Sequence, residues 1–162
     1  IGFDSKVISS LFNAVLKISG KTSDGFLLVS ASTISEAFSV SANSLTALSM
    51  DKNEMPIISS VYHNRLNKNM LLQADPTIQY ILPKKRKRLY EKHTKIDNPY
   101  NTYLYKNLPP GPINNPGFIA IKSALNPHST KYLYFVADTN GRHVFTTNNK
   151  DHINAKNSIR NK

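Results

Sequence analysis

Residues 132–147, Tyr-Leu-Tyr-Phe-Val-Ala-Asp-Thr-Asn-Gly-Arg-His-Val-Phe-Thr-Thr, set the expected fold class. The segments Tyr132 to Ala137 and His143 to Thr147 are rich in aromatic and β-branched residues, which favour strands. Between them, Asp138-Thr139-Asn140-Gly141 has the composition of a tight hairpin turn. The stretch therefore predicts two antiparallel strands close to the C-terminal end.

Most of the chain outside this hairpin has a helical pattern. The predicted helices are one that Asp4 or Ser5 caps and Gly20 ends, Phe26 to Val40, Pro56 to Leu66, Asp75 (as N-cap) to Tyr80, Phe118 to Leu125, and a polar helix from about Asn148. Helices combined with one hairpin, and without internal repeats, predict an α+β fold. We expect a helical scaffold, a small antiparallel sheet and a proline-rich loop that lines a cleft.

The proline-rich loop is the segment Asn107 to Gly117, which holds four of the nine prolines and two glycines. That density excludes a helix or an internal strand, because proline lacks a backbone donor and fixes φ. We therefore predict a stiff, ordered loop. Stiffness suits binding, because little conformational freedom is lost when a ligand is held.

Length and composition limit the class of protein. A chain of 162 residues fits one domain with a real core. The absence of cysteine excludes disulfides, thiolate zinc sites and thiol nucleophiles. The sequence begins with Ile1, and no apolar run approaches the roughly 20 residues that cross a bilayer. We interpret it as an excised soluble domain.

The formal net charge of +11 predicts attraction to an acidic partner. Nucleic acid, anionic lipid and a polymer bearing carboxylates all fit. The densest basic cluster, Lys84 to Arg88, is typical of a solvated loop, and a nucleic-acid or membrane patch is the alternative. We expect the whole basic stretch Pro83 to Pro99 to be exposed. No recognition-helix or RNA-binding signature accompanies the cluster, so nucleic acid is the least favoured partner.

Carboxylates are scarce, and Glu occurs only at positions 36, 54 and 91. Glu36 is the only ionisable side chain in the apolar segment Phe26 to Val40. Burial there would raise its pKa and keep it protonated near neutral pH, as an acid catalyst requires. The alternative, which the residues support equally, is a structural Glu at a helix edge that binds an Arg or a backbone amide.

Two polar motifs are further candidates. Tyr100-Asn101-Thr102-Tyr103 supplies phenols and an amide that can stack on and hydrogen-bond to sugars, or that can pack an irregular loop. Asp75 has the sequence context of a helix cap. The five His show no metal-ligand spacing, and no Gly-rich phosphate loop is present, so we expect no metal and no cofactor.

A series of short motifs follows in fixed order: NRL (64–66), LLQADPT (71–77), YNTY (100–103), LPPGPINNPG (108–117), ALNP (124–127), KYLYFVAD (131–138) and GRHVF (141–145). Together they resemble the catalytic domain of the YceG-like family, the membrane-anchored endolytic murein transglycosylases of bacteria. The resemblance runs from about Phe26 to the end. It predicts that residues 1–162 form a single catalytic domain, with a leading helix and linker over residues 1–25, and that the family's membrane anchor and LysM-like domain are missing.

The resemblance implies an activity and a set of site residues. Glu36 would protonate the glycosidic oxygen between N-acetylmuramic acid (MurNAc) and N-acetylglucosamine (GlcNAc) inside a peptidoglycan strand. Its carboxylate would then take the proton of the muramyl C6 hydroxyl, which leaves a 1,6-anhydroMurNAc end and so terminates or trims nascent glycan. The substrate-binding residues implied are Asn64, Gln73, Asp75, Tyr100, Asn101, Tyr103, Pro110, Asn115 and His143. For His143, which the resemblance directs into the cleft, a structural cross-strand histidine is the alternative.

The sequence departs from the family pattern at two places. Ala31 to Phe38 matches A-S-I-[IV]-x-K-E-A only with a one-residue deletion, because the gapless alignment puts Ala37 at the catalytic position. Ala74 replaces a small hydroxyl residue in Q-[ST]-D-P-T. The second departure removes one polar contact of the family's cleft. The first, together with a stretch from Ser39 to Asn53 that is longer than usual in the family, supports an alternative hypothesis: a catalytically inactive peptidoglycan-binding relative in a cell-wall synthesis or division complex.

The resemblance also implies partners and a location. Peptidoglycan glycan strands are the expected substrate, and penicillin-binding proteins or other cell-wall synthesis and division proteins are candidate partners. No nucleic acid is expected. The location implied is the bacterial inner membrane, reached through an anchor that this chain lacks, with the catalytic domain on the periplasmic, extracytoplasmic side.

Overall fold

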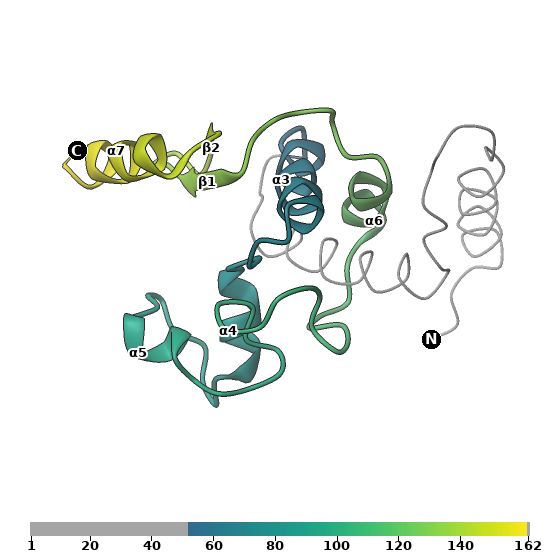
Figure 1. The fold of residues 1–162 in the computed structure, drawn as a ribbon, viewed down its shortest axis with the longest axis vertical. Helices are drawn as coiled ribbons and strands as arrows, with labels where there is room; N and C mark the ends of the chain where they lie inside the picture. The colour runs from purple at the N-terminus through teal and green to yellow at the C-terminus, as the bar shows by residue number, and fades with distance from the viewer. Residues whose placement is uncertain (1–51, 162) are drawn as a thin grey trace, which may run out of the picture. The chain divides into compact units, whose positions relative to one another are not determined.

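The computed structural model describes residues 52–161 of the chain (Figure 1). All of these residues belong to one compact unit. Glu36 and the two predicted N-terminal helices lie outside the described residues, so the predictions made for them stay predictions.

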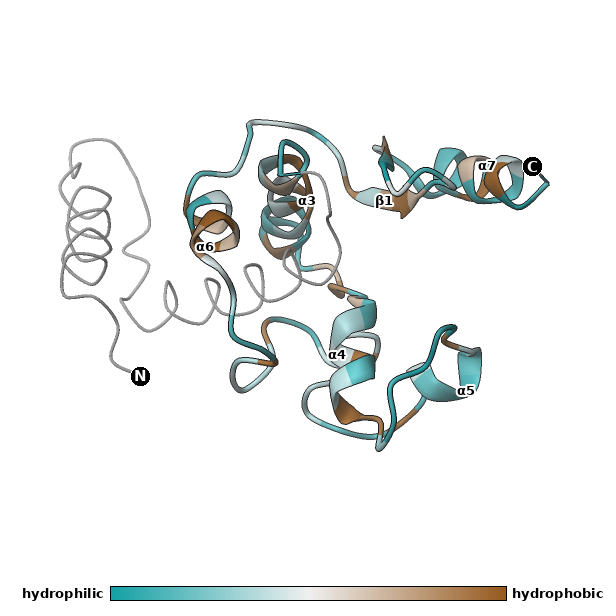
Figure 2. Cartoon of the chain, turned by 180° about the vertical axis from the view of Figure 1, so that it is seen from behind, coloured by the Kyte–Doolittle hydropathy of each residue, from teal (hydrophilic) through white to brown (hydrophobic). Residues whose placement is uncertain are grey.

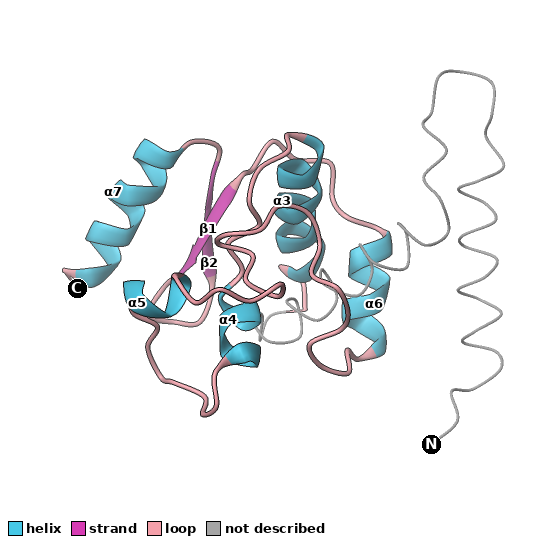
Figure 3. Cartoon of the chain, turned by 60° about the horizontal axis from the view of Figure 1, so that its bottom comes forward, coloured by secondary structure: helices cyan, strands magenta, loops and turns pink. Residues whose placement is uncertain are grey.

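The described part is mostly helical, with one two-stranded antiparallel sheet (Figure 3). The α+β prediction is therefore confirmed. No helix among residues 52–161 has the length and apolar character needed to cross a membrane. The elements are α3 (Met55–Asn67), α4 (Asp75–Ile81), α5 (Glu91–Thr94), α6 (Phe118–Leu125), β1 (Tyr134–Ala137), β2 (His143–Thr146) and α7 (Asn149–Arg160).

The hairpin forms where the sequence predicts it. Tyr134 pairs with Thr146, and Ala137 pairs with His143 at the end beside the turn. In the turn, the Asp138 carboxylate accepts the backbone N–H groups of Asn140 (2.8 Å) and Arg142 (2.9 Å). Gly141 adopts a φ of +77°, which glycine reaches without steric cost. The turn therefore fixes the register that places His143 at the start of β2.

Helices α3 and α6 pack against each other, and both contribute to the core. Figure 2 shows α6 as a largely hydrophobic helix, and its alanines allow a close approach to α3. Complete burial of an Ile side chain contributes roughly 1.5–3 kcal/mol, so these side chains hold the unit together. The buried apolar residues are Met55, Ile58, Val61, Tyr62, Leu72, Ala74, Ile78, Ala120, Ile121 and Ala124.

Helix α7 is polar and packs against both strands of the hairpin (Figures 2 and 3). None of its residues is fully buried. Its start is stabilised by Asn148, whose side-chain oxygen accepts the Asp151 N–H (2.9 Å) and whose amide donates to the Asp151 carboxylate (2.7 Å). This N-cap positions one face of α7 against β1 without requiring an apolar stripe.

The prediction that Asp75 caps a helix is wrong. Ala74 occupies the N-cap position, Asp75 is the first helical residue, and no side-chain cap bond forms. The reason is competition from tertiary partners, because Thr102 binds the Ala74 N–H and Tyr103 binds the Asp75 carboxylate. Proline is still in the first turn, where its missing N–H costs nothing.

The two predicted loops have the expected character, with one exception. Residues 107–117 contain no helix or strand. Lys84 to Arg88 are all exposed, and the Gln79 side chain holds this loop by bonds to the Arg86 C=O (2.7 Å) and N–H (2.9 Å). The exception is His93, which is buried in the short helix α5 within the stretch that we expected to be exposed.

Candidate active site

A cavity of about 470 Å³ lies in the described unit. Its lining comes from four segments: one side of α3, residues 72–75 together with Tyr103, the hairpin, and the first two turns of α7. These segments fall in two parts of the sequence, residues 62–103 and residues 134–156. The cavity therefore exists only because the fold brings the motifs of the central region together with the C-terminal hairpin and helix.

The wall formed by residues 73–75 is held in place by Thr102. Its backbone C=O accepts the Gln73 N–H (3.0 Å), its hydroxyl accepts the Ala74 N–H (2.9 Å), and it pairs with the Thr77 hydroxyl (2.9 Å). Thr77 is 0% exposed and Thr102 is 2% exposed. Gln73 has a φ of +50°, an unfavourable value that these surrounding bonds maintain.

Asp75 and Tyr103 form the polar centre of this wall. The Tyr103 hydroxyl donates to the Asp75 carboxylate. Burial raises the pKa of Tyr103 well above its ordinary value, and the adjacent Asp75 raises it further. The phenol therefore stays protonated throughout the physiological range and remains a hydrogen-bond donor.

Arg65 also lines the cavity and is 6% exposed. Nε donates to the Leu133 C=O (2.6 Å), while Nη1 donates to the C=O groups of Leu71 (2.9 Å) and Leu72 (3.1 Å) and to the Gln73 side-chain oxygen (3.1 Å). Burial lowers the pKa of Arg65, but a guanidinium stays charged in proteins. All of these acceptors are neutral, and neither ion pair among residues 52–161 includes Arg65.

Helix α7 adds two more basic groups to the lining, His152 and Lys156. The His152 ring stacks on Tyr134 at 5.3 Å, and its Nδ1 is buried without a hydrogen-bond partner. Burial lowers the pKa of His152, with smaller contributions from Lys156 and Arg65. This side of the cavity thus combines two permanent positive charges with an unpaired ring nitrogen.

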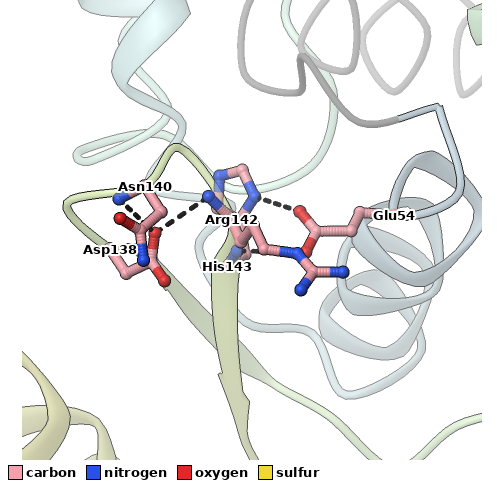
Figure 4. Close-up of polar contacts among 5 residues, drawn as sticks. All are labelled: Glu54, Asp138, Asn140, Arg142 and His143. Carbon is pink, nitrogen blue, oxygen red and sulfur yellow. Dashed lines mark hydrogen bonds and ion pairs between the residues drawn. The ribbon is translucent and has the colours of Figure 1, made fainter.

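His143 reaches the cavity from β2 and is bound by Glu54, the residue that precedes α3 (Figure 4). Ring Nδ1 lies 2.7 Å from Glu54 Oε2, and the His143 N–H donates to Glu54 Oε1 (3.1 Å). The His143 side chain is 2% exposed and the Glu54 side chain is 13% exposed. Sequence reasoning missed Glu54, and the only available signal was that glutamate is rare in this chain.

The structure brings together four of the residues singled out from the sequence. Gln73, Asp75, Tyr103 and His143 all line the cavity. Their roles in binding stay predictions, but their convergence from three separate motifs gives those predictions a common location. Glu36 lies outside the described residues.

Two predicted residues have another local function. The Asn64 amide donates to the C=O groups of Thr130 (2.9 Å) and Tyr132 (3.0 Å), which fixes the approach to β1. The Asn101 amide donates to backbone oxygens of residues 94 (3.0 Å) and 96 (2.7 Å), and its oxygen accepts the Tyr103 N–H (2.9 Å). Neither residue lines the cavity. Both orient segments that do, and their roles in substrate binding stay predictions.

The other three predicted residues, Tyr100, Pro110 and Asn115, are not part of this lining. Tyr100 packs near Tyr80, with ring centroids 4.9 Å apart. Its hydroxyl is 3.1 Å from the position that a Cβ on Gly111 would occupy. Only glycine fits there without displacement, so this contact ties the YNTY motif to the proline-rich loop.

Comparison with known proteins gives the family. The profile of the YceG-like family matches residues 47–158. The chain belongs to the YceG-like family. The matched range contains Glu54 and Glu91, whereas Glu36 precedes it.

Two individual relatives are both named endolytic murein transglycosylase. Over 99 residues the chain is 50% identical to the endolytic murein transglycosylase of Bacillus subtilis strain 168, an alignment that covers 61% of this chain and 28% of that protein. Over 102 residues it is 38% identical to the endolytic murein transglycosylase of Streptococcus pneumoniae strain D39, an alignment that covers 59% of this chain and 18% of that protein. The chain thus spans less than a third of either relative.

A solved structure has the same fold. The crystal structure of a YceG-like protein from Listeria monocytogenes superposes with a TM-score of 0.76 at 30% sequence identity. The match covers 91% of this chain and 44% of the Listeria chain. The arrangement of helices and hairpin around the cavity therefore belongs to the family fold.

Proposed function

We propose that this chain is the catalytic part of an endolytic murein transglycosylase. It cleaves the MurNAc–GlcNAc bond within peptidoglycan strands and leaves a 1,6-anhydroMurNAc end. The observation that carries the proposal is the cavity in which Gln73, Asp75, Tyr103 and His143 meet. Its support from relatives is the 50% identity to a protein with that name.

The lining suits a sugar with many hydroxyl groups. Gln73 can donate and accept, the Asp75 carboxylate accepts, and the Tyr103 phenol is held as a donor. Fixed groups of this kind stabilise a transition state because they do not reorganise as charge develops. In this proposal the proton comes from Glu36, whose carboxylate then accepts the proton of the muramyl C6 hydroxyl as the anhydro ring closes.

The basic side of the cavity supports a substrate that carries carboxylates. Arg65, His152 and Lys156 line this side, and Arg65 has no described carboxylate partner. Muramyl residues bear a lactyl carboxyl group or a stem peptide, and stem peptides bear carboxylates. A glycan seated against Asp75 and Tyr103 can direct such a group toward α7.

Location and partners follow from the same proposal. Peptidoglycan lies outside the cytoplasmic membrane, so the domain acts at the bacterial inner membrane, on its extracytoplasmic face. We propose that residues 1–162 form a single domain and that penicillin-binding proteins or other cell-wall synthesis or division proteins are its partners.

The test is release of anhydro-ended fragments from purified sacculi. The unaltered protein should release them, and Glu36→Gln should not, while thermal unfolding and circular dichroism stay unchanged. Undiminished release by Glu36→Gln removes Glu36 from the mechanism. Retention of glycan strands without any new anhydro or reducing ends by the unaltered protein would instead support the inactive, glycan-binding alternative.

A further inference from the structure

The pair formed by Glu54 and His143 joins two positions 89 residues apart. Each carboxylate oxygen has a separate bond to the same residue: Oε1 accepts the backbone N–H, and Oε2 contacts ring Nδ1 (Figure 4). A single bond would let the imidazole rotate about its side-chain torsions. The second bond fixes the ring relative to its own backbone, so its orientation is determined by Glu54.

The bond to Nδ1 also determines which ring nitrogen is available. A carboxylate can only accept, so Nδ1 must carry the proton in this contact. In the neutral imidazole, Nε2 then has no proton and presents a lone pair. Nε2 is therefore the nitrogen left for a ligand, and it is an acceptor.

His143 itself lies at the cavity. His143 lines the cavity together with Asp75 and Tyr103, whereas Glu54 does not. The Phe135 ring lies edge-on to the imidazole, with ring centroids 5.5 Å apart, and the tilted ring of Phe145 has its centroid 6.2 Å away. Aromatic neighbours exclude water, and low local polarity strengthens the Glu54 bond. Glu54 thus reaches a ligand only through His143.

We infer that Glu54 is a positioning residue, which holds His143 in the Nδ1–H tautomer and presents Nε2 as a hydrogen-bond acceptor to a hydroxyl of the bound sugar. The sugar as ligand rests on the proposed function. The tautomer and its cause rest on the contacts alone.

The first experiment measures the tautomer directly. In ¹⁵N-labelled protein, at a pH where the imidazole is neutral, His143 should show a protonated Nδ1 and an unprotonated Nε2. In Glu54→Gln, the amide NH₂ can donate to Nδ1, so the proton should move to Nε2. The matched control is Glu91→Gln, because Glu91 is the other glutamate in the described part and binds only Lys95 on the surface. It should leave the His143 signals unchanged.

The second experiment tests whether Glu54 acts through His143. In His143→Asn the side-chain amide can still donate to Glu54, but the acceptor at Nε2 is lost. Glu54→Gln and His143→Asn should each weaken binding of a soluble muramyl glycan fragment by about three- to tenfold, the size of one hydrogen bond. The double variant should bind no more weakly than His143→Asn alone, since coupled residues are not additive.

Three outcomes overturn the inference. The first is an Nε2–H tautomer in the unaltered protein, and the second is unchanged His143 signals in Glu54→Gln. The third is a loss of glycan affinity in the double variant that equals the product of the two single losses. The inference also fails if His143→Asn still cleaves glycan and the double variant does not, because Glu54 would then act on the substrate directly. If the unaltered protein binds and cleaves no glycan, the proposed function fails, and the tautomer measurement still tests the role of Glu54.

Discussion

The phenol of Tyr103 donates a hydrogen bond to the carboxylate of Asp75, and this contact joins two motifs that lie 28 residues apart. Both groups face the cavity. The bond explains why Asp75 is not a helix cap, and it gives the pair a property that can be measured in alkaline solution.

Tyr103→Phe should remove part of the alkaline instability of the protein. The pKa of Tyr103 is raised, first by burial and then by Asp75, so folding favours the protonated phenol. That contribution to stability is complete below the unfolded-state pKa of about 10 and is lost as pH rises above it. Between pH 8 and 11 the free energy of unfolding, measured in urea, should fall less for Tyr103→Phe than for the unaltered protein. The exposed Tyr90→Phe should lose stability as the unaltered protein does.

Thr102→Val should destabilise the unit by about 1–3 kcal/mol, because valine keeps the shape but leaves the buried Ala74 N–H without its acceptor. It also removes one of the two hydrogen bonds of the Thr77 hydroxyl, which keeps its bond to the Ala74 C=O. The measurement is urea unfolding at neutral pH. Thr147→Val, at an exposed position, is the matched control and should change stability by less than about 0.5 kcal/mol. Equal effects at the two positions would mean that Thr102 does not hold the wall of the cavity.

Arg65→Lys should destabilise the protein by roughly 2–4 kcal/mol, although the charge is kept. A lysine ammonium is a compact group that cannot reach acceptors on both sides as the guanidinium does at Leu133 and Leu71. The comparison is with Arg160→Lys, at an exposed position in the last turn of α7, which should be close to neutral. A neutral effect of Arg65→Lys would show that one or two of these bonds suffice.

His152→Phe should make the protein less sensitive to mild acid. Burial, Lys156 and Arg65 lower the pKa of His152, so the folded state favours the neutral ring. Its contribution to stability is present above the unfolded-state pKa of about 6.5 and declines as pH falls below that value. Unfolding free energies at pH 7 and pH 5 should therefore differ less in His152→Phe. His128→Gln, at an exposed position, should keep the full difference.

Lys156→Ala should weaken binding of a muramyl glycan that carries carboxylates by about two- to fivefold at low salt, and the loss should shrink as salt is added. Binding of an uncharged chitooligosaccharide should not change. Lys150→Ala, on the same helix but outside the cavity lining, is the control. An equal loss for both ligands would contradict a carboxylate-binding role for this side of the cavity.

Local signals explain which parts of the fold could be predicted. The hairpin has a turn sequence that fixes its own geometry, so its strands were placed to within two residues at each end. The helices around Val61 and Ile121 follow from apolar spacing and from flanking prolines. Both kinds of signal act over a few residues and need no knowledge of the rest of the chain.

The site could be predicted only in part, because its key contacts are long-range. The motifs identified Gln73, Asp75, Tyr103 and His143, which do meet at one cavity. Nothing local indicates that Thr102 binds a segment 28 residues earlier or that Glu54 binds His143 across 89 residues. Asn64 shows the converse case, since a conspicuous motif residue binds backbone oxygens beside the site.

The hydrogen bonds of Arg65 have a consequence for divergence within the family. Three of its four acceptors are main-chain oxygens, at positions 71, 72 and 133. A peptide oxygen is supplied by any amino acid, so mutations at those positions leave the guanidinium satisfied as long as the main chain keeps its path. Substitutions at these three positions can therefore accumulate without removing the bonds to Arg65, while an insertion or deletion in either segment would leave its buried charge without acceptors.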